Sequence, residues 1–333
     1  MRQIRTDECR VRYRRHVPRT QKVASIRSPR HSSVARPPRI APTAAKALRV
    51  VELLAADPTA AVSLAEMQRR LGYSHGNLHA ICTTLVAMGY LRREQGERSY
   101  RLGPALLSIG EAARTAFPSV EIALPFLRTL AAEFDAEAQA AMRSGDTIVV
   151  VARIGDSLPG WGVSVGERFP LTPPMGSTFL AWASDDEREA YLASAAGVLS
   201  AAEIDRCRLA LASVFQRGYS IHVNVEASQK MRETAERIVR EGDTDESDTE
   251  LRALVHEMGR HDYIAIEVDQ IRRGTLVQVS APAFDEDGRV ELSVGLGLRA
   301  QVDGEATVRA LSDRVVATAR MITRAIGGQS PGG

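Results

Sequence analysis

The sequence predicts an α+β protein with two domains, in which a small unit of helices and a hairpin precedes a larger mixed domain. Three observations support this prediction. Three short amphipathic helices and a hairpin follow one another between residues 43 and 102. From residue 120 onward, segments with helical and strand-like periods alternate. The chain has 333 residues, of which 44% are hydrophobic and 25% charged, so it can form two hydrophobic cores.

Residues 1–42 differ from the rest of the chain in charge and are predicted to be a disordered basic tail. They contain twelve Arg and Lys against Asp7 and Glu8, a net charge of +10, while the remainder carries −8. The tail is rich in Arg, Ser and Pro and has no apolar period. Two interpretations stay open: a solvated extension without a specific role, or a non-specific phosphate-binding arm whose effect fades with salt.

The first two predicted helices are marked by capping residues. Thr43 is placed as the N-cap of a helix that reaches residue 55. Ser63 caps a second helix at residues 64–71, and Glu66 stands at the spacing of a capping box. Gly72 is expected to end this helix.

The third predicted helix covers residues 74–88, with Ser74 as its N-cap and Gly89 as its stop. Its apolar residues recur at three and four positions, which predicts one buried face. This face consists of Leu78, Ile81, Cys82, Leu85 and Val86.

A hairpin is predicted directly after the third helix. Its strands are expected at residues 90–93 and 98–102, and Gly96 suits the turn between them. Helix, helix, tight turn, helix and hairpin is the order of a winged helix-turn-helix domain, which is placed at residues 43–103. Residues 104–118 are expected to form a linker helix.

The C-terminal domain is predicted at residues 119–328, before a short tail at 329–333. It is expected to be a mixed α and β domain that begins with an amphipathic helix at 120–134. Strands are expected at 137–142, 147–154, 161–165, 263–268, 276–282 and 290–298. Further helices are expected at 177–184, 185–193, 201–217, 227–240, 248–259 and 304–326.

The outward face of the third helix carries small and hydrogen-bonding side chains near its N-terminus, the end that enters the major groove in this motif. Asn can bond adenine bidentately, and Ser or Thr can bond bases or phosphates. Arginines around the hairpin would contact the DNA backbone. The candidate DNA-binding residues are Ser63, Arg69, Arg70, Ser74, His75, Gly76, Asn77, His79, Thr83, Arg92, Arg93, Arg98 and Arg101.

Three motif-like spacings are rejected on their context, so no cofactor, metal site or enzymatic activity is expected. His75 and His79 have metal-ligand spacing, but no further ligand stands nearby. Residues 295–300 imitate the GxGxxA dinucleotide motif, but too little chain remains to complete the βαβ unit. Residues 243–248 lack the glycine of a calcium loop, and no glutamate stands at its twelfth position.

The three cysteines and the absence of long apolar runs predict a cytoplasmic protein. Cys9, Cys82 and Cys207 lie far apart and form neither a CxxC pair nor an even disulfide framework. No apolar run approaches the roughly 18 residues of a membrane helix. The sequence therefore predicts no membrane partner.

The sequence resembles a known family, the isocitrate-lyase-regulator (IclR) family of bacterial transcription factors. The resemblance covers about residues 42–327. Its matching stretches are 44–55, 63–74, 85–92 and 100–103 in the first part, and 166–171, 175–177, 217–219, 281–285, Gly288 and the closing helix in the second.

The resemblance implies a dimer or tetramer whose C-terminal half is a GAF-like effector domain that binds a small organic acid or aromatic metabolite. In such proteins the ligand sits between the sheet and the segment corresponding to residues 173–179. A helix that starts there would offer amides to an anion. The candidate effector-binding residues are Trp161, Phe169, Met175, Gly176, Ser177, Thr178, His222, Gln278 and Ser280.

The chain departs from the family pattern where the ligand would be recognised. His222 stands where the family often has an Asp, and Gln278 stands where it often has a Cys. Residues 226–269 also resemble an insertion. These departures predict an effector that differs from the small keto acids.

The predicted function is a sequence-specific DNA-binding transcription regulator, usually a repressor in this family. Its partners would be a double-stranded operator, a small effector and further copies of the chain. The alternative is a winged-helix protein that binds another protein and has a structural C-terminal domain without a sensing role. Salt-dependent binding to DNA separates the two hypotheses.

Overall fold

The structure is a computed structural model that describes residues 41–55, 57–94, 99–155, 164–223, 230–231, 233–234, 237, 245–261, 263–267, 276–297 and 305–331. The chain divides into Met1–Ile40 and Ala41–Gly333, and every described residue belongs to the second unit. Residues 1–40 of the predicted tail, Gly96, Arg98, Trp161 and most of the helix expected at 227–240 lie outside the described residues.

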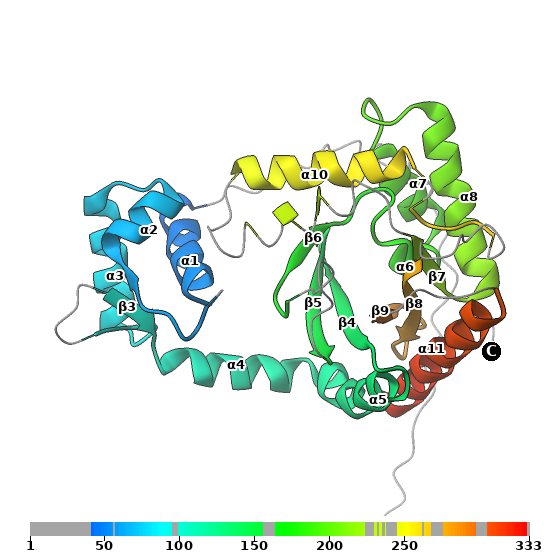
Figure 1. The fold of residues 1–333 in the computed structure, drawn as a ribbon, viewed down its shortest axis with the longest axis horizontal. Coiled ribbons are helices and arrows are strands. Elements are labelled where there is room, and N and C mark those ends of the chain that lie inside the picture. The colour runs from blue at the N-terminus through cyan, green and yellow to red at the C-terminus, as the bar shows by residue number, and fades with distance from the viewer. Residues whose placement is uncertain are drawn as a thin grey trace, which may run out of the picture. The chain divides into compact units, whose positions relative to one another are not determined.

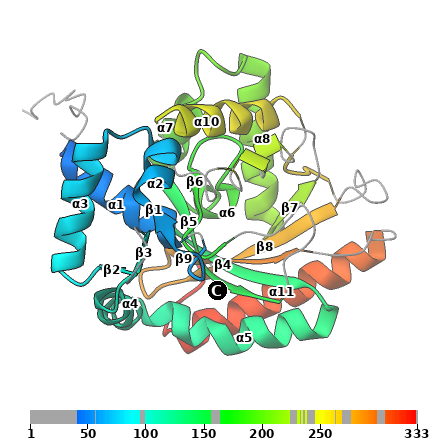
Figure 2. The same cartoon turned by 60° about the vertical axis from the view of Figure 1, so that its left-hand side comes forward.

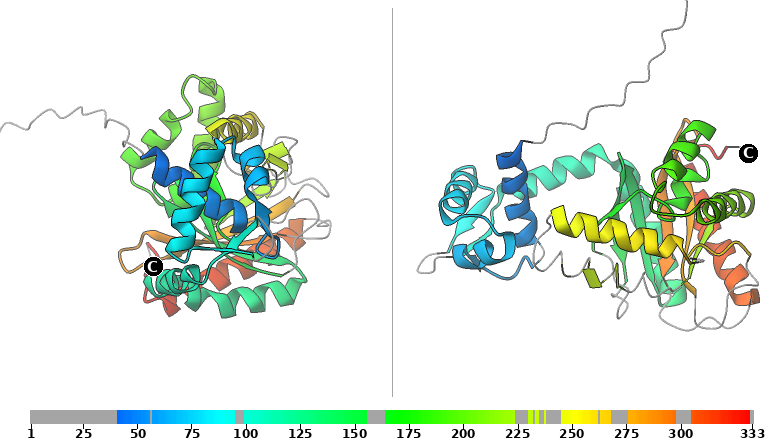
Figure 3. Two further views of the ribbon diagram at one scale, coloured as in Figure 1. Left: turned by 90° about the vertical axis from the view of Figure 1, so that its left-hand side faces the viewer. Right: turned by 90° about the horizontal axis from the view of Figure 1, so that it is seen from above.

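The N-terminal domain consists of three helices and a three-stranded antiparallel sheet (Figures 1 and 3). Its helices are α1 (Pro42–Ala55), α2 (Leu64–Leu71) and α3 (His75–Ala87). Its strands are β1 (Val62–Ser63), β2 (Leu91–Arg93) and β3 (Ser99–Leu102), in the order β1-β3-β2. The helices bury Leu54, Met67 and Leu78 in one core with Leu91 of the hairpin. The three helices and the hairpin strands are therefore confirmed.

Strand β1 was not predicted. It has two residues, which is too short to show an alternating pattern in sequence. Val62 lies opposite Tyr100, and Ser63 lies opposite Ser99. Strand β1 therefore forms by pairing with the edge of β3. The pairing fixes the start of α2 against the hairpin.

The predicted caps of α2 are confirmed, and that of α3 is only partly right. The Ser63 hydroxyl accepts a hydrogen bond from the Glu66 amide at 3.2 Å, and Gly72 ends α2 in the left-handed region with φ 67°. The Glu66 carboxylate pairs with arginines of its own helix. Ser74 is the N-cap residue of α3, but its side chain makes no capping hydrogen bond.

The predicted linker helix is α4 (Ala105–Ala116), which buries none of its residues. Helix α5 (Pro118–Phe134) follows directly, and the Arg114 guanidinium pairs with the Glu121 carboxylate across the junction at 2.7 Å. Within the described residues, no helix is long and apolar enough to cross a membrane.

The C-terminal domain is built on a six-stranded antiparallel sheet of order β6-β5-β4-β9-β8-β7. Its strands are β4 (Glu137–Ser144), β5 (Thr147–Ile154), β6 (Arg168–Pro170), β7 (Ser220–Val223), β8 (Leu276–Phe284) and β9 (Val290–Gly297). Its helices besides α5 are α6 (Ser177–Leu180), α7 (Asp185–Ala193), α8 (Ala201–Arg217), α10 (Asp245–Gly259) and α11 (Glu305–Ala325).

The helices cover the two faces of this sheet in separate groups (Figure 2). Helices α5 and α11 pack on one face, where alternate strand residues such as Ala138, Val279 and Val294 are fully buried. Helices α6, α7, α8 and α10 lie on the other face, in a second core around Phe179 and Val214. The strands alternate between these two cores, as a sheet buried on both faces requires.

Several expected elements of this domain are corrected by the structure. Ser164 and Val165 do not lie in a strand, and the edge strand is β6 instead. The strand expected at 263–268 is reduced, within the described residues, to one bridge between Ile264 and His222. Helix α6 is a single turn where eight residues were expected. Strand β7 was missed because four residues after a helix carry little periodicity.

Candidate DNA-binding and effector sites

The outward face of α3 has the exposure that a DNA-reading surface requires. Its apolar side chains Leu78, Ile81, Cys82 and Leu85 are buried against α1 and α2. The predicted contact residues Ser74, His75, Gly76, His79 and Thr83 are exposed, and Asn77 is half-buried at the edge of this face.

One hydroxyl on this face is already engaged within the helix. Thr83 Oγ1 donates to the His79 carbonyl at 2.7 Å, which leaves the oxygen lone pairs available as acceptors. The Asn77 amide can both donate and accept. The outward face of α3 therefore offers both hydrogen-bond donors and acceptors to the base edges of DNA.

Four of the predicted backbone-binding arginines pair with one of two carboxylates. Glu66 pairs with Arg69 at 2.5 Å and also with Arg70. Glu94, at the end of β2, pairs with Arg101 at 2.9 Å and lies 3.7 Å from Arg92. Neither carboxylate was among the predicted site residues.

These arginines differ in whether their guanidinium groups are already bound within the domain. Arg101 also donates to the Thr59 carbonyl, so its guanidinium is bound within the domain. Arg93 is exposed, and no ion pair is found for it within the described part of the chain. Arg98 lies outside the described residues. The sequence predicted that these arginines contact the DNA backbone. Among those that the structure describes, Arg69, Arg70, Arg92 and Arg101 are paired with a carboxylate, and Arg93 is not.

The candidate effector residues of β7 and β8 lie side by side because of strand register. Ser220 lies opposite Ser280, and His222 lies opposite Gln278. These four side chains share one face, while the intervening Ile221 and its neighbours enter the core under α5 and α11. We call Thr178, Ser220, His222, Gln278 and Ser280 the polar sheet face.

Hydrogen bonds connect the members of the polar sheet face. Thr178 of α6 lies 3.1 Å from the Ser220 hydroxyl, which lies 2.8 Å from His222 Nε2. Gln278 Nε2 donates to the Ser280 hydroxyl at 2.7 Å. Thr178, Ser220 and Ser280 are each at most 3% exposed.

His222 is neutral in this environment. Its Nδ1 lies 3.1 Å from the Tyr263 hydroxyl, so both ring nitrogens have hydrogen-bond partners. Burial, and secondarily the positive charge of Arg217, lowers the pKa of His222 to about 3. The imidazole therefore acts as a hydrogen-bonding group without charge.

A glycine on β9 makes room for this face. Gly295 lies opposite both Ser280 and Gln139. A Cβ at Gly295 would come within 2.4 Å of Gln278 Nε2, so a larger residue would displace the glutamine. This explains a glycine that in sequence looked like part of a nucleotide-binding motif.

The other predicted effector residues do not join the polar sheet face directly. Phe169 is on β6, at the opposite edge of the sheet from β7, and it is core. The half-buried Met175 packs against the same core, and its carbonyl accepts from Tyr191 at 2.7 Å. Gly176 has φ 89°, and a Cβ there would overlap Leu171.

Ser177 is 2% exposed, and its hydroxyl has no hydrogen-bond partner within the described residues. The expected anion site at the start of this helix is not supported, because the single turn of α6 aligns only a few peptide dipoles. Ser177 and Thr178 contribute hydroxyls instead.

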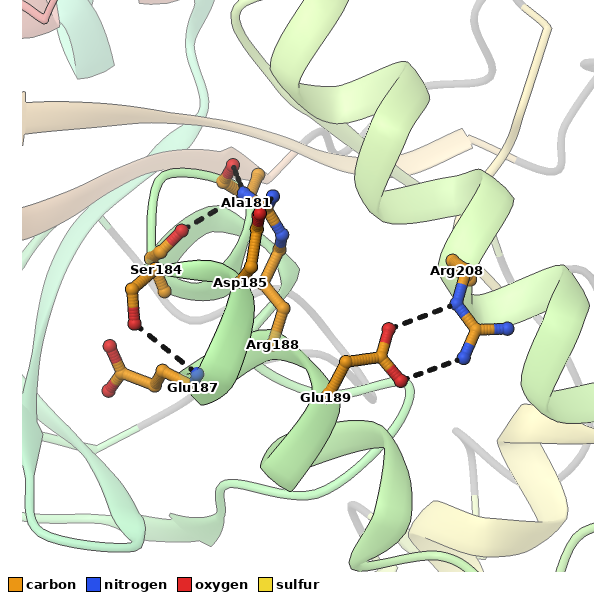
Figure 4. A network of polar contacts seen from close by, with 8 residues as sticks. Ala181, Ser184, Asp185, Glu187, Arg188, Glu189 and Arg208 are labelled. Carbon is orange, nitrogen blue, oxygen red and sulfur yellow. Dashed lines mark hydrogen bonds and ion pairs between the residues drawn. The ribbon is translucent and has the colours of Figure 1, made fainter. Parts of the chain in front are cut away.

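Polar contacts between α7 and α8 hold the helical cover of this face (Figure 4). Arg208 donates two hydrogen bonds to the Glu189 carboxylate, at 3.2 and 3.0 Å. These bonds lower the pKa of Glu189. Arg188 donates to the Ala183 carbonyl at 2.9 Å, and the Ser184 hydroxyl caps α7. The Glu189–Arg208 pair thus links α7 to α8, while the Arg188 and Ser184 contacts order the start of α7.

Sequence reasoning missed Ser220 and Tyr263 as partners of His222. The alternation of polar residues at positions 220 and 222 could have indicated a strand face, but four residues were too few to show it. Tyr263 belongs to the stretch that resembles an insertion. Its distance from His222 along the chain left no local signal.

Comparisons with known proteins agree with this arrangement. A family model described as the IclR helix-turn-helix domain matches residues 43–95. The N-terminal domain is therefore similar to the helix-turn-helix domain of IclR proteins. The chain is 28% identical over 137 residues to the Pca regulon regulatory protein of Pseudomonas putida, an alignment that covers 40% of this chain and 46% of that protein. The chain thus spans less than half the length of this curated relative.

Solved structures of IclR proteins have a similar fold over most of this chain. An IclR transcriptional regulator from Alicyclobacillus acidocaldarius matches with TM-score 0.57 and 20% identity, over 87% of this chain and 100% of that chain. The IclR protein of Thermotoga maritima matches with TM-score 0.55 and 18% identity, over 86% and 99%. An IclR homologue from Microbacterium hydrocarbonoxydans, complexed with 4-hydroxybenzoate, matches with TM-score 0.54 and 18% identity, over 85% and 99%. The two-domain α+β fold is confirmed.

Proposed function

We propose that this chain is a transcription regulator that reads duplex DNA with α3 and anchors on the backbone with the arginines around its hairpin. The match of residues 43–95 to the IclR helix-turn-helix domain carries this proposal. The exposed polar face of α3 supports it, because buried packing uses the opposite side of the helix. Asn77 is assigned to base edges, and Arg93 to phosphates.

We further propose that the C-terminal domain binds a small molecule that changes DNA binding, and that the protein acts as a repressor in the cytoplasm. The polar sheet face supports a ligand site, because it gathers hydrogen-bonding groups in a buried place. An aromatic ligand in a structural relative, the complex with 4-hydroxybenzoate, supports an aromatic or organic-acid class. The proposed domain limits are 43–103, 104–118 and 119–328.

A homo-oligomer fits this role. A dimer would place two reading helices on two half-sites of an operator. An effector that binds one dimer geometry better than the other shifts operator affinity, typically by about 1–3 kcal/mol.

The test is binding of the full chain to the DNA beside its own gene, followed by fluorescence anisotropy across a salt series. Specific binding with a steep salt dependence is expected, because each phosphate contact releases counterions. A scrambled duplex of equal length is the control. Equal and weak binding to both duplexes would contradict the proposal.

One observation favours a second candidate, an interaction module that binds protein. Four of the arginines around the helix-turn-helix are paired with Glu66 or Glu94, which reduces the net positive charge of this surface. If this candidate is right, the salt series would show no specific DNA complex, and the same surface would bind a protein partner.

A further inference from the structure

We infer that the centre of the outward face of α3 recognises thymine, through contacts between its own methyl groups and the 5-methyl groups of thymine bases in the major groove. This inference rests on the proposed DNA-reading function of α3. It adds the base that this face recognises, and it assigns Ala80 and Thr83 as the residues that determine the specificity.

Four small residues occupy the centre of this face. Gly76, Ala80, Thr83 and Ala87 follow one another at intervals of four, three and four residues, so they form one line along the helix. All four are exposed, and the buried apolar side chains of α3 lie on the opposite side. In the described part of the chain, nothing lies within 4 Å of a Cβ added at Gly76. The line is therefore open to a duplex along its length.

Hydrogen bonds within α3 turn its threonine hydroxyls toward the helix backbone. Thr83 Oγ1 donates to the His79 carbonyl at 2.7 Å, and Thr84 Oγ1 donates to the Ala80 carbonyl at 2.9 Å. The γ-methyl is then the group of Thr83 that remains for an apolar contact. Because side chains three residues apart are neighbours on a helix, this methyl lies beside the Cβ of Ala80. The centre of the face thus presents two adjacent methyl groups.

The side chains that recognise guanine and cytosine most strongly do not occur in α3. Arg and Lys bond guanine bidentately, and Asp and Glu accept a hydrogen bond from cytosine. The sequence from Gly72 to Leu91 contains none of these four residue types.

A methyl group on the protein distinguishes thymine from the other bases, because only thymine carries a methyl group in the major groove. Asn77 and His79 lie on opposite flanks of the central line, since a helix turns by about 100° per residue. The Asn77 amide can therefore bond an adenine while the central line contacts thymines. Both contacts select A·T pairs.

The experiment first selects the preferred site of the full chain from a pool of duplexes with a randomised core. Thymines of this site are then replaced one at a time by deoxyuridine, which lacks the 5-methyl group and keeps every hydrogen-bonding atom of the base. Fluorescence anisotropy at fixed salt measures each affinity. We expect thymine in each half-site and a loss of about fourfold for each contacted thymine, because one buried methyl group is lost.

Variants then assign the contacts. Thr83→Ser removes the γ-methyl and keeps the hydroxyl, so at one thymine position the thymine and uracil duplexes should bind this variant equally. Thr83→Val keeps a methyl and removes the hydroxyl, so it should retain the uracil penalty. Ala80→Gly should abolish the penalty at a second thymine, and the penalty is a ratio within one variant, so a fall in overall affinity does not affect it.

Thr129→Ser is the matched control. Thr129 is exposed on α5, and its hydroxyl also donates to the carbonyl four residues earlier, that of Pro125 at 3.1 Å. This variant should keep every uracil penalty of the unchanged chain.

Equal affinity for thymine and uracil duplexes at every position would overturn the inference, and so would a penalty that persists in both Thr83→Ser and Ala80→Gly. A selected site without thymine in its half-sites would also overturn it. In each of these cases the selected site itself leaves the proposed DNA-reading function intact. Selection of no site at all would overturn that function together with the inference.

Discussion

The proposed DNA-reading surface, formed by the outward face of α3 and the arginines around it, and the polar sheet face carry their polar side chains in opposite environments. Around α3 the side chains are exposed and charged, and carboxylates such as Glu94 hold the arginines. On the sheet the side chains are buried and neutral, and they bond one another. The difference follows from desolvation, because moving a charge from water into a protein core raises its free energy strongly.

This contrast predicts how each region responds to substitution. A change on the reading surface should alter DNA affinity and leave the fold intact, because exposed ion pairs contribute little to stability. A change on the polar sheet face should alter stability and ligand binding together, because a buried group left unpaired costs free energy. The following substitutions test the contrast, from the largest expected effect to the smallest.

Gly103→Ala should destabilise the N-terminal domain and leave the stability of the C-terminal domain unchanged. Gly103 joins β3 to α4, and a Cβ there would lie 2.2 Å from the Gly89 carbonyl oxygen. The backbone must move, so we expect the N-terminal domain to lose roughly 3 kcal/mol or more. Urea unfolding followed by circular dichroism should show an early transition for this domain alone.

Gly110→Ala is the matched control for this substitution. Gly110 is in α4 and has nothing within 4 Å of an added Cβ, so alanine should be neutral or stabilise by up to about 1 kcal/mol. Simultaneous loss of both domains in Gly103→Ala would show that they do not unfold independently.

His222 should make the C-terminal domain sensitive to acid. Its pKa is about 3 in the folded chain against an ordinary value of 6.5, so below pH 6.5 the unfolded chain binds the proton better. Stability is fully present above pH 6.5 and is lost as the pH falls toward 3, by at most about 1.4 kcal/mol per pH unit. His222→Asn should reduce this slope, measured as urea midpoints from pH 7.5 to 4.5.

His75→Gln, exposed on α3, serves as the control for His222. Burial also lowers the pKa of His256, which adds a slope of the same sign, so His222→Asn should reduce the acid sensitivity without abolishing it. An unchanged slope in His222→Asn would contradict the buried, neutral state of this imidazole.

Asn77→Ala should reduce discrimination between DNA sites by about 1–3 kcal/mol, the usual value of a bidentate base contact. Competition between operator and altered operator measures it. Arg93→Ala is the matched comparison, because loss of a phosphate contact weakens all sequences alike and lowers the salt slope by about one. Untouched sequence preference in Asn77→Ala would mean that another face of α3 reads the DNA.

Glu94→Gln should have the smallest effect, an increase of DNA affinity. It releases Arg92 and Arg101 from their carboxylate, at about the 0.2–1 kcal/mol of an exposed ion pair. Titrations at several salt concentrations should show a slightly steeper slope. Glu52→Gln, exposed on α1, is the control, and weaker binding by Glu94→Gln would show that Glu94 positions the arginines instead.

The N-terminal domain was predictable to a large extent because its signals are local. Ser63 and Gly72 mark the ends of α2 within a few residues of the helix they cap, and the apolar spacing of α3 defines its buried face. What sequence reasoning missed there depends on pairing across the chain. Strand β1 needs β3, and Glu94 becomes relevant through its contacts with arginines of the hairpin.

The candidate effector site was predictable only as separate residues. Thr178, His222, Gln278 and Ser280 were all expected from the family resemblance, but nothing in sequence indicated that they hydrogen-bond on one face. Phe169 was grouped with them and lies at the far edge of the sheet. Strand order and register decided both outcomes.

The sequence by itself determined the two-domain organisation, the winged helix-turn-helix and the outward residues of its third helix, because helix caps and periods act over a single turn. Only the tertiary structure decided which arginines are free and that the polar sheet face is buried and uncharged. Those properties depend on distances between residues far apart in the chain, and desolvation is set by everything packed around them.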